Sequence, residues 1–369
     1  MKRLNYVDGL KGWCALSVCI FHFLLMFVID GFIGWKCLPE AALNPFEYYF
    51  KWFPYSILTN NSFPLYIFFA LIAFIVSYTF LKNKDENALK QKMIMRYFRF
   101  MPFVLIACIV TYLLLKFNLC PLQEYFDITG NTWGLAMIEQ EFTLLDTLKI
   151  GLFTTYFVRT QLVSPFWCMF YIFLGSMLSF VMMLLYTKIN NKTFFFAFTF
   201  LFFYFVDQNY LAFIVGLIAG IIVNQEYSIS KIKGAALVIV GCILGLFPPV
   251  LLPSFIDIVT LYAIGAGFII IGIHLCFSNN RLLCNKFAEF IGKESLALIV
   301  WQFLVLQSLN IFLYNTFYNA GIDNTANIII NFVINMGIGL FLTWVSSKTV
   351  TPLTNFICNK VKKCLIKAD

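Results

Sequence analysis

Apolar runs close to 20 residues long recur along the whole chain, and they limit the folds that it can adopt. A helix needs about 20 apolar residues to cross the hydrocarbon core of a bilayer. Hydrophobic residues make up 61% of the 369 residues, charged residues make up 12%, and the mean hydropathy is +0.84. A water-soluble chain of this length needs a more polar surface. The sequence therefore predicts an all-α, polytopic membrane protein with no soluble domain.

The apolar runs predict a bundle of about ten membrane-spanning helices in a single domain, residues 1–369. The first run follows Lys2 and Arg3 and has no small-residue cleavage site, so we expect it to be retained as the first span. The predicted spans are residues 11–29, 63–81, 101–117, 165–186, 193–207, 209–224, 234–252, 255–276, 288–311 and 326–347.

Basic residues indicate how this bundle is oriented. Ten spans put both termini on one side, and cytoplasmic loops of membrane proteins carry an excess of Lys and Arg. If both termini are cytoplasmic, all but five of the 26 Lys and Arg residues lie on or near the cytoplasmic side; the exceptions are Lys36, Lys51, Lys116, Lys149 and Arg159. The net charge of +8 therefore indicates contact with membrane lipids and not with nucleic acid.

The 11 cysteines form no recognisable metal or redox motif. The sequence contains no Cys-x-x-Cys pair, so we expect no metal site. Most of the cysteines lie in or near predicted spans, where a free cysteine packs as a small hydrophobic residue. Cys37 and Cys120 fall in predicted outer loops, where the two could form a disulfide.

Two ionisable residues interrupt the first apolar run, within the segment DGLKGWCALSVCIFHF (residues 8–23). At about 100° and 1.5 Å per residue, a helix places Lys11 and His22 on one face, roughly 16 Å apart along its axis. An ionisable residue inside a span is costly and often functional, and imidazole suits proton transfer near neutral pH. The alternative is a buried His22 bonded to a neighbouring helix, with Lys11 extending to the lipid headgroups.

A second candidate site is the pair Arg96 and Arg99 in the segment RYFRF, which precedes the third predicted span. Their i, i+3 spacing puts both guanidinium groups on one face of a helix. From there they could bind phosphate groups in a bidentate manner. The alternative is an ordinary basic flank of a membrane span.

In several segments the chain resembles the acyltransferase-3 family of integral membrane acyltransferases, which includes many bacterial O-acetyltransferases of surface glycans. The family opens with Asp-Gly-Leu-Arg-Gly and has a His eleven positions after the Arg; DGLKG and His22 keep this spacing. Arg96 and Arg99 match a family Arg-x-x-Arg pattern. Later family segments resemble SPFWCMFYIFLGS (164–176), NYLAFIVGLIAG (209–220) and FIGKESLALIVWQ (290–302).

The chain departs from the family pattern at several polar positions. Lys11 replaces Arg, which keeps the charge but loses the planar fork. Ile172 stands where many members have Glu, and Gln302 stands where a His is often found. Ile72-Ala73 replaces a common Ser-Gly pair. Neither Ile172 nor Gln302 can exchange a proton as Glu or His would. The sequence therefore fits both an active enzyme with a different site and a relative that has lost catalysis.

The resemblance implies an O-acyltransferase that moves an acyl group, usually acetyl, from cytoplasmic acyl-CoA to a hydroxyl of a cell-surface or lipid-linked glycan. Acetyl-CoA would be a substrate, and no permanently bound cofactor is expected. The implied location is the bacterial inner membrane. The implied site residues are His22 as the catalytic base, Lys11, Arg96 and Arg99 as donor-binding residues, and Trp167 and Gln302 as substrate-binding residues.

Two other functions also fit the sequence. A relative that has lost catalysis could bind a glycan or assist its export, and the substitutions at Ile172 and Gln302 support this reading. A transporter could use Lys11 and His22 to line a path. Against a transporter, the sequence shows no inverted repeat and no matching pair of Gly/Pro-broken spans.

Overall fold

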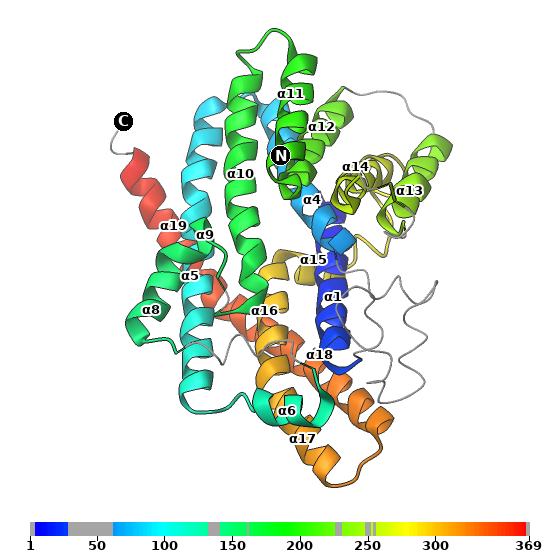
Figure 1. Ribbon diagram of the computed structural model, residues 1–369. Coiled ribbons are helices and arrows are strands. Elements are labelled where there is room, and N and C mark those ends of the chain that lie inside the picture. Colours follow the sequence, from blue (N-terminus) through cyan, green and yellow to red (C-terminus); the bar gives the residue numbers. More distant parts are fainter. Residues whose placement is uncertain are drawn as a thin grey trace. The chain divides into compact units, whose positions relative to one another are not determined.

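The computed structural model describes residues 4–28, 62–131, 141–160, 162–225, 231–247, 252–253 and 256–366. Every regular element in these ranges is a helix, as predicted (Figure 1). The chain divides into two compact units. Unit 1 comprises Met1–Ala15, Ser62–Tyr97 and Tyr171–Lys293, and unit 2 comprises Leu16–Asn61, Phe98–Phe170 and Glu294–Asp369. That the two units make up one domain stays a prediction.

Seven helical segments among the described residues are long and apolar enough to cross a membrane. Each overlaps one of the predicted spans, although the bounds differ by up to 17 residues, as at Asn324–Cys364 against 326–347. They are α1 (Asn5–Phe27), α4 (Ser62–Asn83), α5 (Glu86–Lys116), η4 with α10 (Ser164–Tyr186), α14 (Ile258–Cys276), the segment Ser295–Asn319 and the segment Asn324–Cys364. The chain is therefore a candidate multi-pass membrane protein, by helix length and composition.

Shorter helices stand at the other three predicted spans. They are α11 (Lys192–Val206), α12 (Leu211–Asn224) and α13 (Lys231–Gly245), of 15, 14 and 15 residues. The remaining short elements are α6 (Leu122–Thr129), α8 (Leu144–Lys149), η3 (Ile150–Thr154), α9 (Thr155–Phe157), η5 (Gln208–Tyr210) and α15 (Lys286–Lys293).

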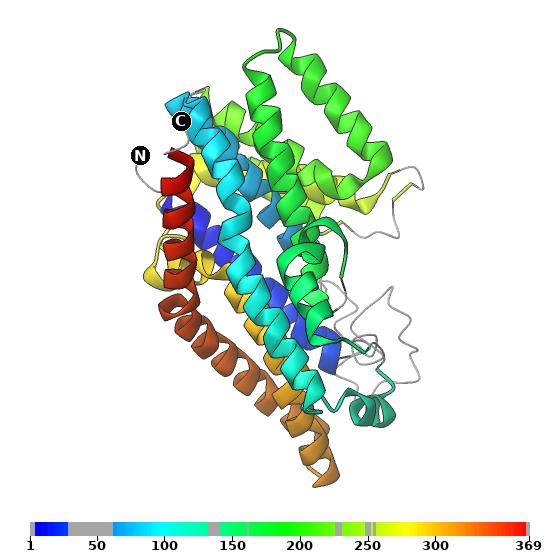
Figure 2. The same ribbon diagram turned by 90° about the vertical axis from the view of Figure 1, so that its left-hand side faces the viewer.

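Glycines bring the helices of unit 1 close together. A Cβ added to Gly216 of α12 would lie 2.1 Å from the carbonyl oxygen of Ala70 in α4. Gly241 of α13 and Gly265 of α14 face each other, because a Cβ on either would lie within 2.8 Å of the other's carbonyl oxygen. Small residues are typical of helix contacts in membranes, where close backbone approach replaces the hydrophobic driving force. Figure 2 shows α10 and α11 beside them as a hairpin.

Unit 2 contains a long helical hairpin. Its first arm is α16 (Ser295–Val305), the π-helical turn η7 (Leu306–Asn310) and α17 (Ile311–Asn319); its second is α18 (Asn324–Lys348), followed by α19 (Val350–Ile366) (Figures 1 and 2). The first arm packs against the end of α1 and against α6 through a core of large apolar side chains. This core includes Phe23, Met26, Phe27, Tyr125, Phe303, Leu306 and Tyr314.

Helix α18 is polar inside and apolar outside. Its buried residues are Asn327, Asn331, Asn335, Gly339, Thr343 and Ser346. Its large exposed side chains are apolar and include Ile329, Val333, Phe341 and Trp344. A surface helix of a water-soluble protein has the reverse pattern, with its apolar stripe facing the core. The exposed face of α18 is therefore suited to lipid, which supports the membrane assignment independently of helix length.

The glycines of the DGLKG segment contact the chain around α15. A Cβ added to Gly9 would lie 1.9 Å from the carbonyl oxygen of Leu283, and one added to Gly12 would lie 2.6 Å from that of Ala288. From the other side, a Cβ on Gly292 would lie 1.7 Å from the carbonyl oxygen of Asp8. The segment is thus a close helix contact within unit 1, whatever its role in function.

We expect Gly9→Ala and Gly292→Ala each to lower the free energy of unfolding by about 1–3 kcal/mol, because the added methyl group meets backbone atoms that cannot move aside cheaply. Gly337→Ala in α18 is the control, since nothing lies within 4 Å of its added Cβ. Alanine is also the better helix former there. Thermal unfolding in detergent would measure the difference. Equal melting temperatures for Gly9→Ala and Gly337→Ala would contradict the described contact.

Candidate functional site

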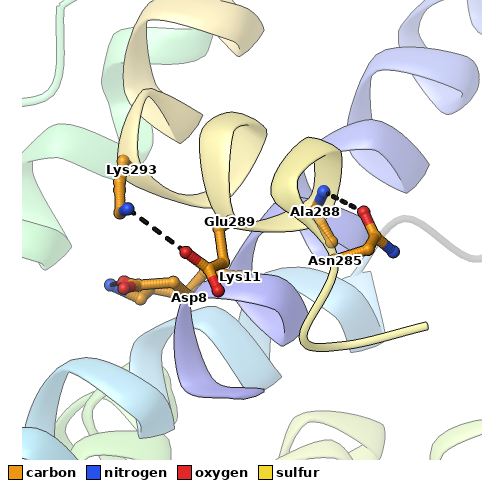
Figure 3. A network of polar contacts seen from close by, with 6 residues as sticks. All are labelled: Asp8, Lys11, Asn285, Ala288, Glu289 and Lys293. Carbon is orange, nitrogen blue, oxygen red and sulfur yellow. Dashed lines mark hydrogen bonds and ion pairs between the residues drawn. The ribbon is translucent and has the colours of Figure 1, made fainter. Parts of the chain in front are cut away.

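Lys11 forms an ion pair one turn along its own helix. Its Nζ lies 3.3 Å from Oδ1 of Asp8, and Asp8 is buried, with 5% of its surface exposed. Figure 3 shows this pair of α1 next to α15, where Nζ of Lys293 lies 3.4 Å from Oε2 of Glu289. Lys11 therefore compensates a buried carboxylate in unit 1. Its part in donor binding stays a prediction.

Arg96 and Arg99 occupy α5, one turn apart, so they share a face of that helix as predicted. Arg96 is half-buried and Arg99 is exposed. Trp167 is the first residue of α10, directly after the 3₁₀ turn η4 (Ser164–Phe166), and 37% of its surface is exposed. Guanidinium groups at or near the surface and an exposed indole suit ligand binding and also suit a membrane interface. The predicted roles of these three residues remain predictions.

The His22 side chain is enclosed by protein and does not face lipid. Only 7% of its surface is exposed. The ring of Phe303 meets the imidazole edge to face with 5.5 Å between centroids, and Phe21 lies on another side at 6.2 Å. The side chain of Gln302 lies next to the imidazole. The structure thus brings together two of the predicted site residues, His22 of α1 and Gln302 of α16, within unit 2.

Gln302 is itself held by α18. Its side chain is fully buried, and its Nε2 donates to Oδ1 of Asn335 at 2.6 Å. In return, Nδ2 of Asn335 donates to the main-chain oxygen of Gln302 at 3.2 Å. Gly339 permits this approach, because a Cβ there would lie 3.1 Å from Cβ of Gln302. The hydrogen-bonded partner of Gln302 is therefore Asn335, and contact of Gln302 with a substrate stays a prediction.

The sequence analysis missed the buried asparagines of unit 2. Asn327, Asn331 and Asn335 recur every fourth residue along α18, and Asn310 faces them from the first arm of the hairpin. The segment NIIINFVIN carried a visible signal, since polar residues at i, i+4 and i+8 of an apolar span share one face. Polar residues inside spans turn towards other helices because lipid cannot bond them.

The second histidine lies elsewhere. His274 belongs to α14 in unit 1, where its Nδ1 lies 2.5 Å from the hydroxyl of Tyr6. The rings of Phe74 and Tyr78 also contact it. This setting agrees with a packing role for His274.

Within the part of the chain that the structure describes, no three His, Cys, Asp or Glu residues could hold a metal ion together. Ten cysteines in that part are free, and Cys120 is among the buried ones. Cys37 lies outside the described residues, so its predicted pairing with Cys120 stays a prediction. The described site in unit 2 thus consists of an imidazole and the buried amides beside it.

Comparisons of the chain with protein-family models, with curated proteins and with solved structures gave no match. The resemblance to the acyltransferase-3 family therefore depends on the quoted residues alone. What the chain does is for that reason stated below as a proposal.

Proposed function

We propose that the protein is a membrane O-acyltransferase. It moves an acyl group, acetyl in the simplest case, from cytoplasmic acyl-CoA to a hydroxyl of a cell-surface or lipid-linked glycan. The placement of His22 supports this proposal most. A titratable ring is enclosed in a membrane-type helix bundle, lies next to one neutral amide side chain, and is set on the same face of α1 as Lys11.

In this reaction His22 acts as a general base. One ring nitrogen donates its hydrogen to Gln302, so the other nitrogen presents a lone pair. That nitrogen takes the proton of the acceptor hydroxyl while the hydroxyl oxygen attacks the thioester carbonyl carbon. The carbon–sulfur bond then breaks, and the CoA thiolate leaves and accepts the proton from the imidazolium. The products are an ester and free CoA, and His22 returns to its neutral form.

The basic residues supply the donor site of this proposal. Arg96 and Arg99 bind the phosphates of CoA, because guanidinium groups match phosphate oxygens in a bidentate geometry. The pantetheine arm then follows α1 from Lys11 towards His22, a rise of roughly 16 Å along a straight helix. Trp167 stacks on the sugar of the acceptor, as exposed indoles commonly do with flat apolar faces.

The proposal includes a finer topology. The three shorter helices α11, α12 and α13 also cross the membrane, which makes ten spans and puts both termini in the cytoplasm. The distribution of Lys and Arg supports this orientation. A donor that is made in the cytoplasm and a basic cytoplasmic face are then on the same side. The expected location is the inner membrane of a bacterium.

A second candidate is a non-catalytic relative that binds a glycan or assists its export. Two observations favour it: Ile172 is buried and apolar where many family members carry Glu, and Gln302 does not titrate. This protein would bind acyl-CoA or glycan without cleaving a thioester. Binding and cleavage therefore need to be measured separately, and neither activity would be expected of a transporter.

We expect His22→Ala to reduce acyl transfer at least about 100-fold, the usual contribution of a positioned general base. The assay uses the purified protein in nanodiscs with radiolabelled acetyl-CoA, scored for binding and for thioester cleavage. His274→Ala is the matched control, since His274 lies among the rings of unit 1. Unchanged transfer by a well-folded His22→Ala protein would remove His22 from the mechanism. Binding without cleavage by the unaltered protein would favour the second candidate.

We expect the double variant Arg96→Gln, Arg99→Gln to weaken acetyl-CoA binding about tenfold or more, because each lost charge-assisted hydrogen bond contributes on the order of 1.5–3 kcal/mol. The double variant Lys188→Gln, Arg281→Gln removes the same charge from exposed positions that share the predicted cytoplasmic side. Equilibrium binding would compare the two. If both double variants lose the same affinity, Arg96 and Arg99 act only through the general charge of the surface.

Cys364 offers a test of the finer topology, because it is the exposed cysteine among the described ones. We expect a membrane-impermeant maleimide to label Cys364 in inverted vesicles and not in intact cells. The Cys364→Ser variant shows which part of the signal belongs to this residue. Labelling of Cys364 from outside the cell would contradict cytoplasmic termini.

A further inference from the structure

A continuous row of five buried amides begins at Gln302, whose side chain lies next to His22. Nε2 of Gln302 donates to Oδ1 of Asn335 at 2.6 Å, and Nδ2 of Asn335 donates to Oδ1 of Asn310 at 2.8 Å. Nδ2 of Asn310 donates to Oδ1 of Asn331 at 2.9 Å, and Nδ2 of Asn331 donates to Oδ1 of Asn327 at 2.8 Å. All five side chains are fully buried. We call this chain of hydrogen bonds the amide row.

The amide row has one direction. In each link the nitrogen belongs to the residue nearer His22 and the oxygen to the next residue. The row ends where Nδ2 of Asn327 donates to the main-chain oxygen of Tyr314 at 3.0 Å. At the other end, Oε1 of Gln302 is buried next to the imidazole of His22 and accepts no hydrogen bond from the described residues. Oε1 is therefore the atom of the row that can accept the N–H of the His22 imidazole.

The direction of the row is difficult to reverse at one residue alone. If the amide of Asn335 turned over, its nitrogen would face Nε2 of Gln302 and its oxygen would face Oδ1 of Asn310. Two hydrogen bonds would become two repulsive contacts, in surroundings where each buried unpaired group costs about 1–3 kcal/mol. The neighbours of Asn335 thus hold its orientation, and Asn335 holds that of Gln302.

We propose that the amide row is a positioning device that holds His22 in one neutral tautomer. Gln302 presents a carbonyl oxygen to the imidazole, so the ring nitrogen beside it carries the hydrogen and the opposite nitrogen carries the lone pair. The catalytic meaning of this arrangement rests on the function proposed above, in which the opposite nitrogen is the base. The tautomer itself does not depend on that function.

The inference gives His22 a neutral partner. A catalytic histidine commonly needs a hydrogen-bonding partner that sets its tautomer and its ring orientation. In this proposal Gln302 supplies that partner, and the amides behind it determine which end of the Gln302 side chain faces the ring.

A purely structural role of the amides makes a different prediction. Hydrogen bonds between buried amides stabilise helix contacts in membranes wherever they lie. In that case the loss of any member of the row would lower stability, and the proton on His22 would be indifferent to the row. The position of that proton is therefore the measurement that separates the two roles.

The test is nitrogen NMR of the full-length protein in nanodiscs, labelled with ¹⁵N at histidine. The chain has two histidines, so the spectrum of His22→Ala identifies the His22 signals and His274 serves as an internal control. We expect unaltered His22 to favour one neutral tautomer at least about tenfold, which corresponds to 1.4 kcal/mol, within the range of a single hydrogen bond. An even mixture of both tautomers in the unaltered protein would overturn the proposal.

Variants of the amide row then show which residues cause the tautomer preference of His22. Asn335→Leu removes the link next to Gln302 and should reduce the preference to below about threefold. Asn327→Leu removes the same group from the same helix at the far end of the row, and it should leave the preference unchanged. If Asn335→Leu does not fold, Gln302→Met removes the acceptor at similar volume and should give the same mixture. A persistent single tautomer in Gln302→Met would overturn the proposal.

The acyl-transfer assay distinguishes this inference from the proposed function. A single tautomer that depends on Asn335 in a protein without thioester cleavage leaves the amide row correct and the enzyme proposal wrong. Cleavage by a protein whose His22 shows both tautomers equally leaves the enzyme proposal standing and rejects the row as a positioning device.

Discussion

The hydrogen bonds between buried amides of α16, η7 and α18 are the interaction on which the candidate site depends. An amide in a membrane helix must find its partner in the protein, because hydrocarbon offers none. Gln302, Asn310 and the asparagines of α18 satisfy one another, and this requirement holds the hairpin in one register. The same register sets Gln302 against His22. The hydrogen bonds between the amides thus determine both how the hairpin packs and where Gln302 lies relative to the imidazole.

The helices of this chain were largely predictable because their signals are local. A run of apolar residues indicates a span without knowledge of its neighbours, and each of the ten predicted runs contains a helix. Three of these helices are shorter than the other seven segments. Helix α11 ends before Asp207, α12 ends at Asn224 and α13 ends before the turn after Gly245. At 14 or 15 residues, they fall below the length of a typical span.

The candidate site was predictable only in part. His22 was identified from its type and spacing and Gln302 from the family resemblance, but their contact depends on how α1 packs against α16, which no pattern within either helix specifies. The link between Gln302 and Asn335 joins residues 33 positions apart and depends equally on helix register. By contrast, the ion pair of Lys11 with Asp8 lies within one turn and was open to prediction. The family resemblance drew attention to Lys11, which stands in place of Arg, and not to its partner Asp8.

The single direction of the amide row has an electrostatic consequence. Each amide is a dipole of about 3.5 D, the value of a peptide unit, and aligned dipoles add. The carbonyl ends of all five side chains point along the row towards His22. The row therefore presents partial negative charge to the ring without placing an ion in the membrane. In the proposed reaction, a field of this sign favours the step in which the ring gains a proton, and it is in place before any substrate arrives.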